Sequence, residues 1–112
     1  MSVKDTNTID GMGVEKSTNT LVFLIIDPYP WNTGEYDHLK TFQQKINSYV
    51  AYIENKGYES AYGSKAFDGF RIEAEFKYSP TEAGKSFFEA GKKQLAERNI
   101  EFVWSTVKKD DE

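Results

Sequence analysis

His38 is the only histidine in the chain and the first candidate for acid–base chemistry. A catalytic histidine needs a carboxylate or a nucleophile beside it. The nearest acidic residues in sequence are Asp27, Glu35 and Asp37. An ordinary surface histidine near a helix start explains the same pattern, and we favour that interpretation. An enzyme centred on Asp27 and His38 is therefore the third-ranked functional hypothesis.

The spacing of acidic residues and glycines does not match a metal or cofactor motif. Asp10, Asp27, Glu35, Asp37 and His38 form the one cluster worth checking, and they lack the spacing of an EF-hand loop or a zinc site. The glycines at positions 11 and 13 are not followed by a third glycine or a helix, as a dinucleotide site requires. The sequence therefore predicts no metal and no cofactor.

Glu73 and Glu75 lie two positions apart in an alternating segment, so a strand would present both on one face. Such a pair could serve acid–base work. Arg71 and Lys77 share that face, which favours a ladder of ion pairs on a solvated surface.

Two aromatic loops are candidates for binding a partner. Tyr29 and Trp31 lie in a loop made rigid by Pro28 and Pro30, and such rings are common binding hot spots. The more common alternative is that Trp31 folds down as a lid on the core. Tyr58 and Tyr62 belong to a second loop, where some rings must plug the end of the core.

Periodicity predicts four strands and two helices. Expected strands cover residues 9–15, 20–26, 70–78 and 100–107, and expected helices cover residues 32–56 and 79–98. Residues 21–26 are all apolar, so we expect this strand in the middle of the sheet with both faces covered. Residues 70–78 alternate strictly and should bury one face only.

Capping signals set the expected helix ends. Asn32 or Thr33 should cap the first helix, and Gly57 should end it. Ser79 should cap the second, with Pro80 at its first position and Glu82 completing the capping box. Gly84 and Gly91 lower helix propensity, which suggests close approach to the sheet.

The element order ββαβαβ predicts an α+β two-layer sandwich, with a mixed four-stranded sheet and two helices on one face. We expect one domain over residues 9–107, with flexible polar tails at residues 1–8 and 108–112.

Composition narrows the class of protein. The chain has 112 residues, no cysteine and a net charge of −4, which argues against disulfides, thiol chemistry and nucleic-acid binding. The first residues lack the apolar core of a signal peptide, and residues 21–26 are too short a run for a membrane span. A cytoplasmic protein that binds no nucleic acid or membrane is the expectation.

The order of several short segments resembles a family of small bacterial proteins of unknown function. The segments that carry the resemblance are Ile9-Asp10, the strand ending at Asp27, Trp31, His38-Leu39, Gln44-Lys45-Ile46-Asn47-Ser48-Tyr49, Ile53-Glu54 and Lys77-Tyr78-Ser79-Pro80-Thr81-Glu82. They extend from Ile9 to about Phe102. The family has no established activity, but small acidic bacterial domains of this sort include immunity proteins, which neutralise toxins.

The leading hypothesis is accordingly a non-catalytic immunity protein that binds a cognate toxin. A basic, nuclease-type toxin would be steered electrostatically toward an acidic binder. The contact candidates are Tyr29, Trp31, Tyr58, Tyr62, Glu73 and Glu75. The second hypothesis is a module that forms homodimers through an exposed sheet edge.

Overall fold

The computed structural model describes residues 2–31 and 34–107. Its elements follow the chain as β1 (Gly11–Glu15), β2 (Thr20–Asp27), α1 (Glu35–Glu54), α2 (Glu59–Tyr62), β3 (Gly69–Phe76), α3 (Glu82–Ala96) and β4 (Ile100–Thr106). The predicted α+β class and order of strands and long helices are confirmed. The short helix α2 takes up part of a segment that we expected to be a loop.

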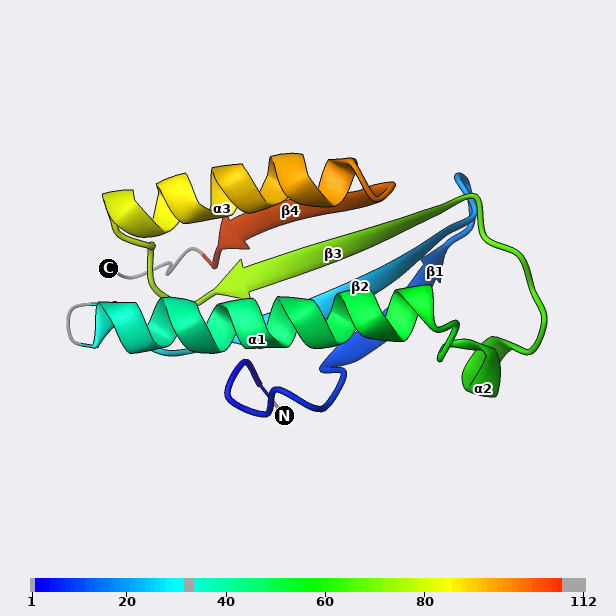
Figure 1. Ribbon diagram of the computed structural model, residues 1–112, viewed down its shortest axis with the longest axis horizontal. Coiled ribbons are helices and arrows are strands. Elements are labelled where there is room, and N and C mark those ends of the chain that lie inside the picture. The colour runs from blue at the N-terminus through cyan, green and yellow to red at the C-terminus, as the bar shows by residue number, and fades with distance from the viewer. Residues whose placement is uncertain (1, 32–33, 108–112) are drawn as a thin grey trace.

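The four strands form one mixed sheet in the order of the chain, β1-β2-β3-β4 (Figure 1). β1 and β2 form an antiparallel hairpin, whereas β2, β3 and β4 run parallel to one another. Each parallel step needs a long crossover. α1 and α3 supply these crossovers.

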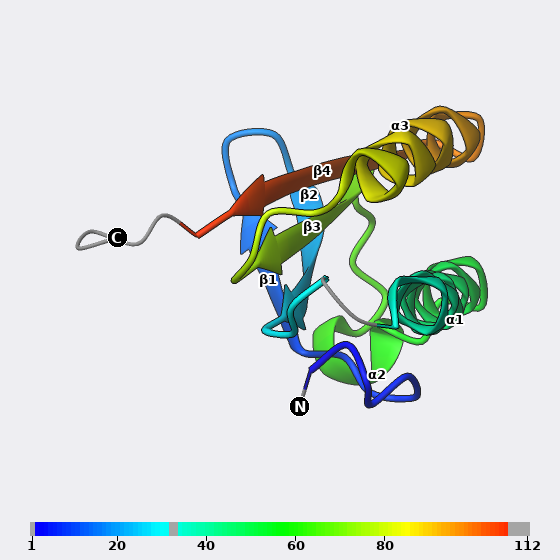
Figure 2. The same cartoon turned by 90° about the vertical axis from the view of Figure 1, so that its left-hand side faces the viewer.

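Both long helices cover the same face of the sheet, as predicted (Figure 2). Aromatic rings fill the layer between them and the strands. Phe88 of α3 lies within 5.0 Å of Phe42 and Phe76, measured between ring centroids. Among the described residues, no helix combines the length and the apolar character needed to cross a membrane.

The expectation that β2 is covered on both faces is wrong. Its exposure alternates: Leu21, Phe23 and Ile25 are fully buried, whereas Val22, Leu24 and Ile26 are only half-buried. Within the part of the chain that the structure describes, no helix lies over the second face (Figure 2). β3 behaves as its alternating sequence predicts.

The ends of α1 differ from those expected. The predicted caps Asn32 and Thr33 lie outside the described residues, and the cap position belongs to Gly34 with a φ of 65°. At the other end Lys56, not Gly57, adopts the left-handed conformation. Gly57 follows as the next residue and donates its N–H to the Tyr52 carbonyl. A Cβ at position 57 would lie 2.6 Å from the Tyr52 ring, which explains the glycine.

α3 begins later than predicted. Thr81, not Ser79, is its cap, and the Thr81 hydroxyl accepts the Gly84 N–H. Residues 77–80 are needed to carry the chain from the sheet to the helix layer, and Pro80 is buried there. Gly84 lies close to Pro80 and Thr81 rather than to the sheet, and a Cβ on Gly91 would meet nothing within 4 Å.

We expected residues 1–8 to be a flexible tail, but residues 2–8, here called the N-terminal segment, are packed against the fold. Val3 is 1% exposed and donates its N–H to the Ile26 carbonyl. This hydrogen bond attaches the segment to β2 beyond the end of β1. The second predicted tail, residues 108–112, lies outside the described residues.

Candidate functional site

The six predicted contact residues do not form one surface. Trp31 and Tyr58 are only 5% and 7% exposed, so both belong to the core. Trp31 packs edge-on against Phe76 and Phe88. It therefore folds down as a lid on the core, as the alternative interpretation of this loop predicted. Neither ring can offer its face to a partner in this conformation.

The remaining tyrosines lie at different places. Tyr62 is half-buried against Phe67, and Tyr58 contacts the same ring, which closes one end of the core. Tyr29 is half-buried near the N-terminal segment, where the Lys4 ammonium lies 4.1 Å from its ring centroid. Tyr29 therefore belongs to a separate part of the surface.

Glu73 and Glu75 point outward from the uncovered face of the sheet, as their alternation predicts. We call this surface the open face. It consists of the outward residues of the four strands, and the register arranges them in rows. Three rows are Val22, Arg71 and Glu101; Leu24, Glu73 and Val103; and Ile26, Glu75 and Ser105. An apolar stripe on β2 is thereby placed beside charged side chains on β3.

Arg71 is the centre of the charged part of the open face. Its guanidinium donates to Glu73 and Glu15, each at 2.9 Å, and to Glu101 at 3.4 Å. No ion pair is found for Glu75 within the described residues. Three carboxylates thus share the one strand cation of this face, and Glu75 stays outside the group. The predicted ladder exists through Arg71, and Lys77 follows β3 without an ion pair among the described residues.

A shallow depression of about 410 Å³ runs over this face between β1 and β3. Val22 and Leu24 form its floor, and Arg71, Glu73 and Glu75 line one side. Two glycines of β1, Gly11 and Gly13, line the other side. The open face therefore combines a recessed apolar centre with a charged margin.

The ion pairs change the acidity of Glu15. The Arg71 guanidinium, through its hydrogen bond, holds the pKa of the Glu15 carboxyl below its usual value, and the Thr18 hydroxyl lowers it further. The hydrogen bond with Glu15 in turn raises the pKa of Arg71. Glu15 is therefore charged over the whole physiological range of pH.

Replacing Arg71 by glutamine is expected to raise the pKa of Glu15 toward its ordinary value. A carboxyl with a lowered folded-state pKa stabilises the fold above its unfolded pKa, and this contribution is lost as pH falls through the folded value. The free energy of unfolding of Arg71→Gln should therefore fall less on acidification than that of the unmodified chain. A carbon-detected NMR titration of Glu15 measures the shift, with Lys77→Gln as the control. An unchanged Glu15 titration in Arg71→Gln would contradict the assignment.

Asp27 and His38 form a second polar site, at the end of β2. The distance from His38 Nε2 to Asp27 Oδ2 is 2.6 Å, and the two side chains are 8% and 0% exposed. The interpretation of His38 as an ordinary surface histidine is therefore wrong. Trp31 stacks on the imidazole with ring centroids 3.6 Å apart.

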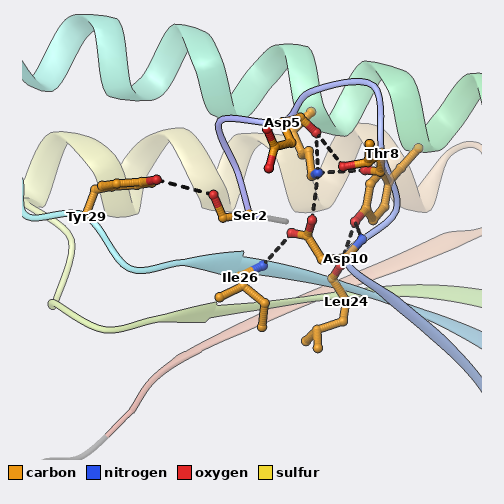
Figure 3. Close-up of polar contacts among 9 residues, drawn as sticks. Ser2, Asp5, Thr8, Asp10, Leu24, Ile26 and Tyr29 are labelled. Carbon is orange, nitrogen blue, oxygen red and sulfur yellow. Dashed lines mark hydrogen bonds and ion pairs between the residues drawn. The ribbon is translucent and has the colours of Figure 1, made fainter.

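A third polar cluster holds the N-terminal segment against α1 (Figure 3). The buried Lys45 ammonium donates to Asp10 Oδ1 at 2.9 Å and to the carbonyl oxygens of Asp5 and Thr8, each at 2.6 Å. Asp10 Oδ2 accepts the Ile26 N–H. The cluster therefore joins the N-terminal segment, β2 and α1.

Tyr49 completes this cluster. Its hydroxyl accepts the Asp10 N–H and donates to the Leu24 carbonyl. Burial raises the pKa of the Tyr49 phenol, so it keeps the proton that it donates. Lys45 is a charged residue on the buried side of α1. Its spacing of three from Phe42 and four from Tyr49 could have shown that it lies within the apolar stripe.

The acidic residues that were candidate metal ligands do not converge. Asp10 binds Lys45, Asp27 binds His38, and Glu35 accepts a hydrogen bond from the Thr81 hydroxyl. Among residues 2–31 and 34–107, no group of three or more His, Cys, Asp or Glu side chains is placed to hold a metal ion.

Comparison with known proteins gives one match. A family model described as a family of unknown function, DUF6572, matches residues 1–108. No curated protein matches the chain. No solved structure matches it either.

Proposed function

Since the chain belongs to the DUF6572 family, whose function is unknown, we propose a function from its own surface: it is a binding protein that captures a basic protein partner on the open face. The observation that carries this proposal is the uncovered sheet face, where the carboxylates of Glu15, Glu73 and Glu75 line a recessed apolar stripe. Protein interfaces combine an apolar centre with a polar margin in this way.

The charges favour a basic partner. On this face β1, β3 and β4 carry four carboxylates, whereas the cations are Arg71 on β3 and Lys77 just after it, and the whole chain carries a net charge of −4. Complementary charge speeds diffusional capture and excludes acidic competitors. Lysine and arginine side chains of a partner would pair with the margin while apolar groups cover Val22 and Leu24.

The two predicted glutamates have different parts in this proposal. Glu73 is already held by Arg71, so it contributes a fixed negative charge at low entropic cost. Glu75 is exposed and has no ion pair among the described residues. Glu75 is therefore the residue best placed to gain a new ion pair with a partner.

The finer form of the proposal is an immunity protein that neutralises a cognate toxin of nuclease type. A nuclease must attract the phosphates of nucleic acid, so its binding surface is basic. An acidic face that covers such a surface would block the substrate. The acidity of the open face supports this form of the proposal, and a growth assay with the captured partner tests it.

Charge reversal tests the proposal. Tagged protein is used to capture partners from its native cells, and the affinity of any basic partner is then measured for two variants. Glu73→Lys/Glu75→Lys is expected to weaken binding at least tenfold, about 1.4 kcal/mol, because it places like charges across the interface. Glu89→Lys/Glu97→Lys makes the same change in net charge on and beside α3, and is expected to have a much smaller effect.

Equal weakening by the two variants would mean that only net charge matters and that the open face is not the interface. Recovery of the chain with only itself would favour the self-associating module instead. For the immunity form, co-expression with the captured partner should restore growth that the partner alone prevents, and the open-face variant should not.

A further inference from the structure

The open face lacks the second cover that its parallel strands call for. β2, β3 and β4 run parallel to one another, and parallel sheets are almost always covered on both faces. In residues 2–31 and 34–107 both long helices lie on the opposite face (Figure 2). Val22, Leu24 and Ile26 of β2 are half-buried on the open face, and Val107 is 52% exposed. A second layer over these side chains has to come from outside the described residues.

Two hollows on the open face define the space for this layer. The depression of about 410 Å³ has Val22 and Leu24 on its floor, and a second one of about 360 Å³ lies over Ile26 and Val107. Glu75 lines both, so the hollows follow one another along β2. β1 and β3 lie about 10 Å apart on either side of β2, which is close to the diameter of one helix. The eight residues of β2 extend about 26 Å, the length of a helix of about 17 residues.

Gly13 keeps the β1 side of the depression low. It pairs with Val22 in the register, so a side chain at position 13 would stand on the open face. A Cβ there would meet nothing within 4 Å, and the backbone of Gly13 is not in the left-handed region. A glycine inside a strand weakens the strand and often marks a place where another chain approaches closely. No contact within the described chain explains this glycine, whereas space for a partner does.

Charge and backbone pairing determine which kind of partner fits this space. Three carboxylates line the depression, those of Glu15, Glu73 and Glu75. A second copy of the chain would bring the same acidic surface against them. The backbone groups of β2 are already paired with β1 on one side and β3 on the other, so a partner strand cannot join β2. An amphipathic helix presents only side chains, with apolar groups in one stripe and charges beside it.

We infer that the open face binds a basic amphipathic helix of the partner, which lies along β2. Apolar side chains of that helix fill the depression over Val22 and Leu24, beside the bare backbone of Gly13. Its lysine or arginine side chains pair with Glu73 and Glu75. The helix adds a third layer, so the parallel strands are covered on both faces. This inference rests on the proposed binding function and adds the kind of element that the partner presents.

Two synthetic peptides of equal composition test the inference on the intact chain. Each has about 18 residues, half leucine and half lysine. The leucines recur at helical spacing in one peptide and at every second position in the other. The helix-patterned peptide is expected to shift the methyl NMR signals of Val22 and Leu24 saturably. The strand-patterned peptide is expected to bind at least tenfold more weakly.

Gly13→Gln and Gly91→Gln form a matched pair of variants. Both place an uncharged side chain where a Cβ meets nothing within 4 Å, one on the open face and one on α3. Urea denaturation is expected to show that neither variant is less stable than the unmodified chain. Gly13→Gln should weaken binding of the helix-patterned peptide at least tenfold, and Gly91→Gln should leave it unchanged.

The inference is overturned if the two peptides bind equally well or if the two glycine variants bind the helix-patterned peptide alike. A loss confined to Gly91→Gln would also overturn it, because the peptide would then lie between α1 and α3, in the groove that Gly91 lines. None of these results contradicts the proposed binding function. That function fails separately, if both charge-reversal variants described above weaken binding of the captured partner equally.

Discussion

Replacing Lys45 by methionine is expected to lower the free energy of unfolding by about 3–5 kcal/mol. The Lys45 and Asp10 side chains are both 0% exposed, so the variant leaves a buried carboxylate without its cation. It also removes the donors of two carbonyl oxygens in the N-terminal segment. Urea denaturation followed by circular dichroism measures the change.

The matched control is Lys40→Met, an exposed lysine on the same helix, which should change stability by less than about 0.5 kcal/mol. Adding Asp10→Asn to Lys45→Met should recover part of the loss, since the orphaned charge is removed. A Lys45→Met variant as stable as the Lys40→Met control would show that the cluster does not support the fold.

Replacing Phe88 by alanine is expected to cost about 3–5 kcal/mol, the range for truncating a buried aromatic ring. Phe88 is 1% exposed and contacts rings from both helices, two strands and the loop after β2. Its ring neighbours are Trp31, Phe42, Phe76, Phe87, Phe102 and Trp104. Truncation leaves a cavity that these rings can fill only partly.

Phe87→Ala provides the comparison within the same helix turn. Phe87 is half-buried and contacts Phe88 at 5.6 Å between centroids, so its loss should be less than half as large. Thermal and urea unfolding of both variants give the two values. Equal losses of unfolding free energy in the two variants would contradict the central position of Phe88 in the core.

Local patterns predicted the fold well. The alternation of residues 70–78 placed Ile72 inward and Glu73 outward, and the open face follows from that alternation. The run of apolar residues at 21–26 led to the wrong prediction that both faces of β2 are covered. Apolar residues do fill both faces of that strand, but helices cover only one of them. The predicted starts of the helices were wrong because the position of a cap depends on how many residues the chain needs to pass from the sheet to the helix layer. The local sequence does not specify that number.

The polar sites were harder to predict because they join distant residues. Lys45 meets Asp5 across 40 positions, and no short motif marks such a pair. Asp27 and His38 are only 11 positions apart, and their proximity in sequence made them candidates. Their burial could not be foreseen, because it depends on how Trp31 folds over the imidazole.

The order of the strands has a consequence for synthesis on the ribosome. Because the sheet order follows the chain order, each new strand finds its only required neighbour already made. The β1–β2 hairpin can form first, and β3 and then β4 add to the growing edge as they emerge. Lys45 lies in α1, so the N-terminal segment can be fastened to the hairpin before β3 is translated. The fold can therefore be assembled in one direction, without waiting for the end of the chain.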